Sequence, residues 1–279
     1  MSPIDRAFVR TEGGLVHLRQ TEGAAGGRPL VLLHASPGSS RGLEGLMGAL
    51  GGTRAAPRLI APDMPGNGDS DDLAPADPDI GFYAAALIGL LDRMGLDRVD
   101  LYGSHTGARI ACEAAAAFPA RIGRVIFDGI ADYPEEMRDM LVRDYAPEMA
   151  PDDYGRHFLW AFHFVRDQVL HFPHFQRDPT HRLTTRAMPS AAELHGSVLE
   201  VLKGLTSYHK AYRAAFRYRA TERMAAIAAP ALLISAENEL PALRAATAGF
   251  AAALDDGRVD VVGRDLPAKA AAIARFLEW

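Results

Sequence analysis

The stretch VDLYGSHTGARIACEAAAAF, residues 99–118, decides how the rest of the chain is interpreted. It begins with a short apolar run typical of a buried strand and ends in an Ala-rich run typical of a helix. Between these runs, Gly103 and Gly107 flank His105, each two residues away. A side chain held at the centre of a strained strand-to-helix turn requires small residues at these flanks. The sequence therefore predicts a sharp turn with His105 at its tip.

Ser104 offers an alternative centre for this turn, because serine is the usual nucleophile of such a motif. That register would place Tyr102 and Thr106 at the two flanking positions, and a tyrosine is far too large there. Histidine is among the side chains that tolerate positive φ better than most. We therefore expect His105, and not Ser104, at the centre of the turn.

Apolar runs on both sides of this stretch alternate with helical segments. The runs PLVLLHAS (29–36) and RLIAPDM (58–64) are typical of strands buried on both faces, and RVIFDGI (124–130) is also predicted to be a strand. The segment AFVRTEGGLVHLRQTEG (7–23) predicts an N-terminal hairpin. Strands that alternate with helices in this way predict an α/β fold with a mostly parallel central sheet flanked by helices.

The alternation stops between Tyr133 and Ala220, where the sequence becomes helical, aromatic and rich in Arg and His. We interpret residues 133–220 as an inserted helical lid (cap), and residues 1–132 and 221–279 together as the core. The 279-residue chain is long enough for one large domain with such an excursion.

Composition narrows the class of partner. A formal net charge of -5 gives no electrostatic reason to expect nucleic acid or an anionic membrane. The expected partner is a small-molecule substrate, and a homodimer is left open. Cys112 is the only cysteine, which excludes an intramolecular disulfide and a thiolate metal cluster. The N-terminus lacks the apolar core of a signal peptide and no apolar run reaches about 18 residues, so a cytoplasmic location is expected.

Three segments resemble the α/β-hydrolase fold family in their order and spacing. HASPGSS (34–40) is similar to the family's oxyanion loop after the third strand, with Ser36 at the position of the backbone N–H donor. APDMPGNGDSD (61–71) is similar to the loop after the fourth strand, and LYGSHTGA (101–108) to the nucleophile elbow. The resemblance implies an α/β-hydrolase fold with an inserted helical lid, and a hydrolase-like enzyme.

The chain departs from this family at two catalytic positions. Its elbow carries His105 in place of serine. The family's general base, a histidine after the last strand, falls near Gly263 and Arg264, and no histidine follows His209. An orthodox Ser-His-Asp relay therefore cannot be built. The family's acid position after the seventh strand falls on Glu239, a tolerable exchange for aspartate.

His105 offers a chemical replacement for the missing pair. An imidazole can accept a proton or attack an electrophilic carbon near neutral pH without a partner that deprotonates it. We expect His105 to act as nucleophile or general base, and Glu239 or Asp128 to orient its ring. The N–H groups of Ser36 and Thr106 are expected to face a developing oxyanion, which suits a carbonyl substrate.

The lid segment RHFLWAFHFVRDQVLHFPHF (156–175) combines aromatic residues, histidines and an Arg-Asp-Gln triplet. It resembles the lid of a subgroup of these hydrolases that pairs a histidine elbow with the same triplet. That resemblance implies that Arg166 and Asp167 face the pocket, where Arg166 would grip a carboxylate or an enolate oxygen. A surface ion pair, or a tether between lid and body, is the alternative for both residues.

The lid histidines raise the question of a metal site. His171 and His174 straddle Pro173, which disrupts a regular helical pair, and no third ligand follows at a recognisable spacing. We expect no metal and no cofactor.

The residues expected to contact the substrate or the oxyanion lie on the family-like loops and on the lid. They are Ser36, Thr106, His34, Ser104, Arg166, Asp167 and Trp160. For His34 the resemblance implies chiefly a structural role, in which it orders its loop through backbone hydrogen bonds.

Three functions remain open. The first is an enzyme that hydrolyses an ester, a lactone or an activated C–C bond of a small, partly apolar carbonyl compound, with His105 in place of the usual serine. The second is cofactor-free lyase, decarboxylase or oxygenase chemistry on the same scaffold, which needs only a base and an oxyanion hole. The third is a non-catalytic ligand-binding protein.

Overall fold

The computed structural model describes residues 3–53, 55–184, 187–237, 239–263 and 265–279. Its strands, in chain order, are β1 (Asp5–Thr11), β2 (Gly14–Gln20), β3 (Leu30–Leu33), β4 (Leu59–Pro62), β5 (Val99–Ser104), β6 (Ile122–Asp128), β7 (Ala231–Ala236) and β8 (Gly257–Val262). They form an 8-stranded sheet in the order β1-β2-β4-β3-β5-β6-β7-β8. Pairing is antiparallel for β1 with β2 and for β2 with β4, and parallel from β4 to β8. The predicted hairpin and the predicted mostly parallel sheet are both confirmed.

Burial of the strands follows their place in the sheet. Every residue of β3, β4 and β7 is buried, as expected for continuous apolar runs covered on both faces. The edge strands β1 and β8 are largely exposed or half-buried instead, and Val259 and Val261 of β8 face solvent. The apolar core is therefore centred on the parallel strands in the middle of the sheet.

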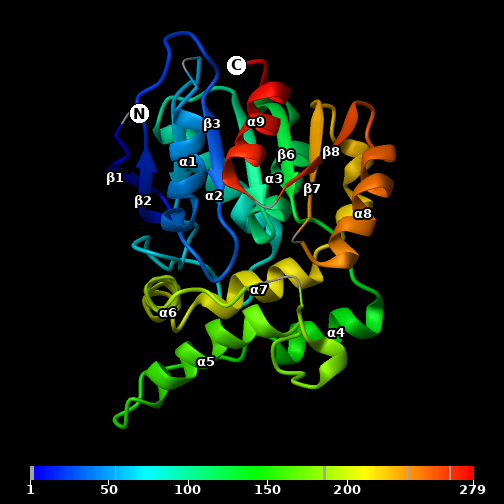
Figure 1. Cartoon of the computed structure of the whole chain (residues 1–279). Helices are drawn as coiled ribbons and strands as arrows, with labels where there is room; N and C mark the ends of the chain where they lie inside the picture. The colour runs from blue at the N-terminus through cyan, green and yellow to red at the C-terminus, as the bar shows by residue number, and fades with distance from the viewer. Residues whose placement is uncertain (1–2, 54, 185–186, 238, 264) are drawn as a thin grey trace.

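Helices cover both faces of this sheet (Figure 1). The helices are α1 (Glu44–Gly51), α2 (Ile80–Arg93), α3 (Thr106–Ala117), α4 (Glu135–Asp144), α5 (Arg156–Leu170), α6 (Ala191–Lys203), α7 (Tyr208–Arg217), α8 (Pro241–Ala252) and α9 (Leu266–Leu277). One apolar cluster joins the sheet to α1 and α9, and a second joins its other face to α2, α3 and α8. None of the helices within the described ranges combines the length and the apolar character needed to cross a membrane.

The segment expected to form the lid, residues 133–220, is called the insertion below. It contributes α4 to α7 between β6 and β7, and these helices gather at the carboxyl edge of the parallel strands (Figure 1). An aromatic cluster of its own holds the insertion together. The Asp132 carboxylate accepts hydrogen bonds from the N–H groups of Ala220 at 2.8 Å and Thr221 at 3.0 Å. The two points where the chain leaves and rejoins the body are thus held together.

The insertion is docked onto the loop that follows β4. The ammonium groups of Lys203 and Lys210 each lie 2.8 Å from a carboxylate oxygen of this loop, on Asp69 and Asp72 respectively. The Ser207 hydroxyl also donates to the carbonyl of the same loop at Gly66, at 2.5 Å. These contacts close one side of the space between the insertion and the sheet.

Candidate active site

His105 lies at the tip of a tight turn between β5 and α3. Its backbone has φ 49 and ψ -102, in a region that few non-glycine residues adopt. A Cβ atom at Gly103 would lie 2.2 Å from the Gly107 carbonyl oxygen, and one at Gly107 would lie 2.3 Å from the Leu33 carbonyl oxygen. Both flanks must therefore be glycine, because the strand, the turn and the helix pass too close for any side chain.

The turn lies where the sheet reverses its direction of winding. From β3, the chain passes first to β4 on one side and later to β5 on the other side. In open α/β sheets, ligands bind in the crevice outside the carboxyl ends of the strands at such a point. Ser36 in the loop after β3 and His105 after β5 lie at this crevice, and both line a cavity there.

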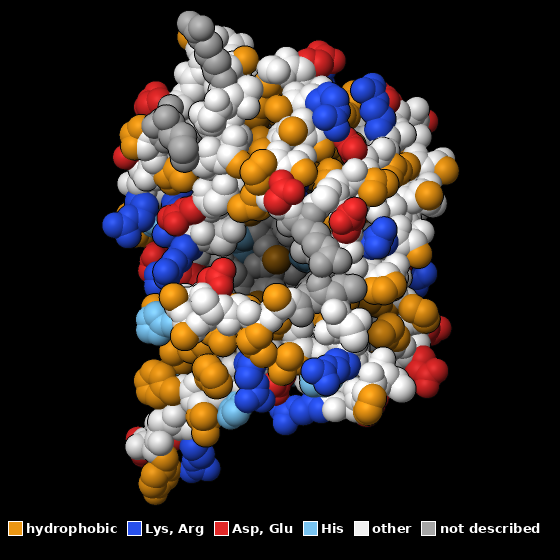
Figure 2. Space-filling model, in the orientation of Figure 1, with side chains coloured by type: hydrophobic (Ala, Val, Ile, Leu, Met, Phe, Trp, Pro, Cys, Tyr) orange, Lys and Arg blue, Asp and Glu red, His pale blue; other side chains and the backbone are white. Residues whose placement is uncertain are grey.

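This cavity has a volume of about 160 Å³. The sheet side contributes polar groups, and the insertion contributes mostly aromatic ones. The cavity is lined by Ala35, Ser36, His105, Thr106, Arg109, Tyr133, Tyr145, Gln168, Phe172, Leu183, Tyr212, Ala215, Phe216 and Leu240. Figure 2 shows the molecular surface hollowed between the insertion and the body of the sheet. Polar groups on one side of a cavity and aromatic groups on the other are typical of a small-molecule site.

The imidazole of His105 contacts a carboxylate. Its Nε2 atom lies 3.2 Å from Oε2 of Glu239, and the two side chains are 39% and 9% exposed. The other oxygen of Glu239 accepts the N–H of Leu240 at 2.7 Å, which fixes the carboxyl group. If Nε2 carries the proton facing the carboxylate, Nδ1 keeps its lone pair. A carboxylate next to Nε2 favours this tautomer, in which Nδ1 is the basic atom.

Gly129, which follows β6, makes room for this pair. It has φ +80, and a Cβ atom there would lie 2.8 Å from Cε1 of His105 and 3.1 Å from Oε2 of Glu239. The ring of His105 is thus packed against the Gly129 backbone. Any side chain at this position would push the imidazole and the carboxylate out of place.

Two residues that line the cavity with His105 have backbone N–H groups free of partners within the described residues. They are Ser36 and Thr106, the first residue of α3. The N-terminus of α3 adds the positive end of its dipole at the same place. The arrangement can stabilise negative charge on an oxygen atom close to His105.

Asp128, the alternative acid for His105, has a different environment. Its carboxylate oxygen Oδ2 lies 2.5 Å from the Tyr102 hydroxyl and 2.5 Å from the Lys269 ammonium. Its backbone carbonyl accepts the N–H of His105 at 2.9 Å. The structure therefore brings Glu239 to the His105 ring, whereas Asp128 holds the backbone of the turn.

His34 is buried behind the cavity and joins two loops. Its Nδ1 atom lies 2.9 Å from the Ala35 carbonyl oxygen, and Nε2 accepts the N–H of Met64 at 3.0 Å. Burial lowers the pKa of His34, so its ring is neutral, with the proton on Nδ1. Both ring nitrogens are used by the backbone, and His34 does not line the cavity.

The expected entry of Arg166 and Asp167 into the pocket is corrected by the structure. Two nitrogens of Arg166 lie 2.9 and 2.7 Å from Oδ1 of Asp167, and Arg177 lies 2.8 Å from its other oxygen. Both guanidinium groups thus pair with one carboxylate within the insertion, and neither Arg166 nor Asp167 lines the cavity. Successive helical residues point about 100° apart, so Gln168 faces the cavity instead. Its amide donates to the Tyr212 hydroxyl at 3.1 Å.

Trp160 and Ser104 are also absent from the cavity lining. The Trp160 ring stacks on Phe164 with centroids 4.9 Å apart, inside the aromatic cluster of the insertion. Ser104 is the last residue of β5 and interacts with the Tyr102 side chain. Its place on the strand leaves His105 as the residue that the turn presents.

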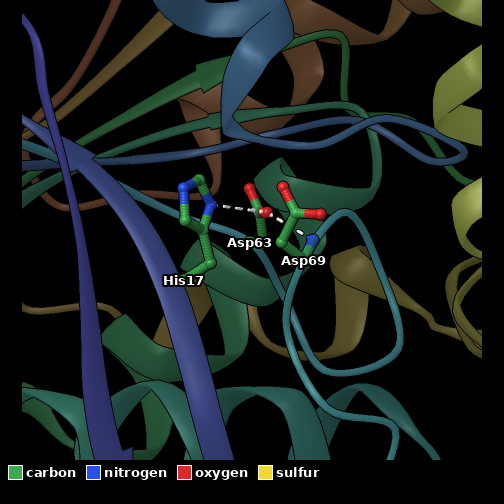
Figure 3. A group of neighbouring side chains, drawn as sticks. All are labelled: His17, Asp63 and Asp69. Atoms are coloured by element: carbon green, nitrogen blue, oxygen red, sulfur yellow. Dashed lines mark hydrogen bonds and ion pairs between the residues drawn. The ribbon is translucent and has the colours of Figure 1, made fainter.

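A polar cluster outside the cavity braces the loop after β4 (Figure 3). His17, Asp63 and Asp69 lie close enough to suggest metal ligands. However, the Asp63 carboxylate already accepts Nδ1–H of His17 at 2.9 Å and the N–H groups of Ser40 at 2.7 Å and Asp69 at 2.9 Å. Asp69 in turn pairs with Lys203. These contacts show that the cluster stabilises the loop after β4.

A family model described as the alpha/beta hydrolase fold matches residues 28–247 of the chain. The chain belongs to the α/β-hydrolase fold family. The structure of epoxide hydrolase A from Mycobacterium thermoresistibile is similar, with a TM-score of 0.73 and 21% identity over 99% of this chain and 98% of that chain. At this level of identity, the likeness extends to the fold alone.

Curated relatives within the α/β-hydrolase fold family match part of the chain. A 2-hydroxy-6-oxononadienedioate/2-hydroxy-6-oxononatrienedioate hydrolase of Paraburkholderia phymatum is 34% identical over 122 residues, 42% of each protein. A 2-hydroxy-6-oxo-2,4-heptadienoate hydrolase of Pseudomonas putida is 34% identical over 128 residues, 44% of this chain and 45% of that protein. The matched region thus spans less than half of the length of these relatives.

Arg109 and Gly129 were missed by sequence reasoning, although both have a recognisable signal. Arg109 follows His105 by four residues, and side chains four apart share one face of a helix. Gly129 directly follows a predicted strand, where a glycine often permits the backbone to approach another group closely. For the position at which the α/β-hydrolase resemblance implies a base, Gly263 is described, whereas Arg264 lies outside the described residues.

Proposed function

We propose that this protein hydrolyses an activated carbon–carbon bond next to a carbonyl group in a small molecule, with His105 as the general base. The observation that carries the proposal is the contact of Glu239 with His105, which lines the cavity together with Ser36 and Thr106. The two curated relatives described above are named as hydrolases of 2-hydroxy-6-oxo dienoate-type compounds, which supports this class of substrate.

The proposed reaction begins with a water molecule next to Nδ1 of His105. Nδ1 takes one proton as the water oxygen bonds to the carbonyl carbon, and the imidazolium that forms is stabilised by Glu239. The carbonyl oxygen becomes an oxyanion and accepts the N–H groups of Ser36 and Thr106.

Collapse of this adduct completes the proposed reaction. The carbonyl re-forms as the adjacent C–C bond breaks, and the electron pair leaves with the departing carbon. That carbon, stabilised by its own conjugated carbonyl group, takes the proton from the imidazolium. One water is consumed, one carboxylic acid and one shortened carbonyl compound are released, and His105 returns to its neutral form.

A general base is favoured over a nucleophile because the chain offers a single imidazole at this place. An acyl group on His105 would occupy the nitrogen that must activate water for its own release, and no histidine follows His209 to replace it. Direct attack by water needs one base and one oxyanion site. In this proposal His105 is the base, and Ser36 and Thr106 form the oxyanion site.

The test is the hydrolysis of 2-hydroxy-6-oxo-2,4-heptadienoate, followed by ultraviolet absorbance and product analysis. The His105→Ala variant is expected to lose at least about 10²-fold in kcat, because a positioned base contributes roughly 10²–10⁴-fold. The matched control is His195→Gln, at an exposed position on α6, which should retain full activity. Equal turnover by His105→Ala and the wild type would remove His105 from the chemistry.

The choice between base and nucleophile has its own test. Rapid quenching during turnover, followed by mass spectrometry of the intact protein, should reveal no acyl adduct. Hydrolysis in H₂¹⁸O should place one labelled oxygen in the acid product by either route, and it checks only that water supplies the new oxygen. A serine-directed phosphonate should fail to label the protein. An acyl group trapped on His105 would contradict the role of general base.

A further inference from the structure

Arg109 is a buried cation in the lining of the cavity. It lies on α3 one helical turn after His105, and the whole residue is only 5% exposed. One of its terminal nitrogens donates to the His105 carbonyl at 3.2 Å and the other to the Ala131 carbonyl at 2.7 Å. Its Nε atom is buried and has no hydrogen-bond partner among the described residues. These contacts fix the guanidinium beside the turn.

No carboxylate compensates the charge of Arg109. Every aspartate and glutamate of the chain falls within the described residues, and none of them forms an ion pair with this guanidinium. The other polar group beside it is the Tyr133 hydroxyl, and burial raises the pKa of this phenol. Tyr133 is therefore neutral and supplies a dipole but no negative charge. Carbonyl groups likewise supply only dipoles.

An uncompensated buried cation is costly. The effective penalty for removing one ion from water is several kcal/mol, and buried charges are normally paired. Two other arginines of low exposure follow that rule, since Arg19 pairs with Glu44 and Arg223 with Glu113. Arg109 differs from them in facing a cavity. An anionic ligand in the cavity would supply the missing charge.

We infer that Arg109 binds a carboxylate group of the substrate, and thereby selects small carboxylic acids for this cavity. The inference rests on the proposed function only in taking the cavity as the substrate site. A carboxylate fits better than an enolate, because the guanidinium is permanently charged and needs an anionic partner as soon as the substrate binds. A carboxylate carries its charge at that stage, whereas an enolate forms only during the reaction. Guanidinium groups also match carboxylates in shape and hydrogen-bonding geometry.

The size of the cavity limits the acid. An apolar cavity of roughly 150 Å³ holds one benzene-sized molecule, and this cavity measures about 160 Å³. The aromatic side chains of Tyr145, Phe172 and Phe216 would contact the carbon skeleton. A planar or conjugated acid with a skeleton of about this size therefore fits the space.

The test compares benzoate with benzamide, which have the same shape and differ in charge. Isothermal titration at pH 7.5 should give the wild type at least tenfold tighter binding of benzoate. The Arg109→Gln variant should bind both compounds with dissociation constants within about twofold of each other. Arg109→Lys, which keeps the charge, should retain a preference for benzoate. Circular dichroism and thermal unfolding establish that each variant is folded.

Two controls separate this inference from the proposed chemistry and from other arginines. His105→Gln should lose catalysis and keep the preference for benzoate, so a His105→Gln variant that retains full catalysis together with the preference would contradict the proposed function alone. Arg217→Gln should also keep it, because Arg217 lines a different hollow and pairs with Asp77. A tenfold preference that survives in Arg109→Gln would overturn the inference. Equal binding of benzoate and benzamide by the wild type would also overturn the inference, and this result does not depend on whether Arg109→Gln folds.

Discussion

Glu239 contacts the imidazole of His105 directly, with Oε2 lying 3.2 Å from Nε2. In a Ser-His-Asp relay, a histidine stands between the acid and the residue at the tip of the turn. Here the histidine is itself at the tip, and the acid that follows β7 reaches it without an intermediate. In the proposed reaction, this pair keeps the orienting function of the relay and needs no alkoxide.

The charge of Glu239 should be essential for the proposed reaction. Glu239→Gln keeps the size of the side chain, but its amide can donate to Nε2 and so place the proton of His105 on Nδ1. Nδ1 would then no longer be basic, and we expect kcat to fall by at least about 10²-fold. An Asp→Asn change in a Ser-His-Asp relay, which also gives the wrong histidine tautomer, lowers kcat strongly. Glu237→Gln, at an exposed position of the same loop, is the control and should be unaffected. A Glu239→Gln variant within threefold of the wild type would contradict the assigned role.

Gly129→Ala should damage the site by steric displacement. The new methyl carbon would lie 2.8 Å from Cε1 of His105, and the positive φ adds about 1–2 kcal/mol of backbone strain. Activity should fall at least tenfold in steady-state assays. Gly155→Ala carries a similar strain, with φ +68, but has only Phe158 nearby at 3.4 Å. This control should lose stability and keep its kcat, and equal losses of activity in both variants would refute the steric explanation.

Lys269→Met should affect stability and leave the chemistry intact. The substitution leaves the buried Asp128 carboxylate with Tyr102 as its remaining partner. Breaking a buried pair from one side costs about 3–5 kcal/mol, and we expect about 2 kcal/mol because the Lys269 side chain is 21% exposed. Urea unfolding measures this loss, and kcat at 25 °C should stay within threefold. Lys203→Met removes the exposed pair with Asp69 and should cost less than about 1 kcal/mol.

If Asp128, and not Glu239, were the acid that supports His105, the outcome would be different. Lys269→Met and Asp128→Asn would then lower kcat as strongly as Glu239→Gln does. We expect the opposite order, with the large loss confined to Glu239→Gln. The comparison decides between the two acids that the sequence left open.

The fold could be predicted because its signals are local. Gly103 and Gly107 limit the turn to one register, and the continuous apolar runs of β3, β4 and β7 identify strands buried on both faces. Each of these patterns depends on a few neighbouring residues and on backbone geometry. The parallel sheet follows from their alternation with helices.

The site could be predicted only in part, because its contacts join distant segments. Glu239 follows β7 and Asp128 ends β6, both at the carboxyl edge of the sheet, and contacts with Tyr102 and Lys269 assign Asp128 to other partners. The direction of Arg166 depends on helix rotation within the insertion, where Asp167 and Arg177 hold it. Helical periodicity gives relative directions along α5 but cannot say which face meets the cavity.

The pH dependence of stability should reflect the buried histidines. Burial lowers the pKa of His34, and it also lowers the pKa of His174 and His209. In the unfolded chain these histidines have a pKa of about 6.5. Below that pH the unfolded state therefore binds more protons than the folded state. The free energy of unfolding should therefore fall as the pH decreases from 7.5 through 6.5 to 5.5.

His34→Gln tests the share of this effect that belongs to the loop behind the cavity. Loss of the hydrogen bonds to Ala35 and Met64 should cost about 1–2 kcal/mol at pH 7.5. The further loss between pH 7.5 and 5.5 should be smaller than in the wild type, because one group that resists protonation in the folded state is gone. Urea unfolding at pH 7.5 and at pH 5.5 measures this loss of unfolding free energy. His195→Gln, at an exposed position, is the control and should lose as much between the two pH values as the wild type does. A wild type that is more stable at pH 5.5 than at 7.5 would contradict a neutral His34 ring with a hydrogen bond at each nitrogen.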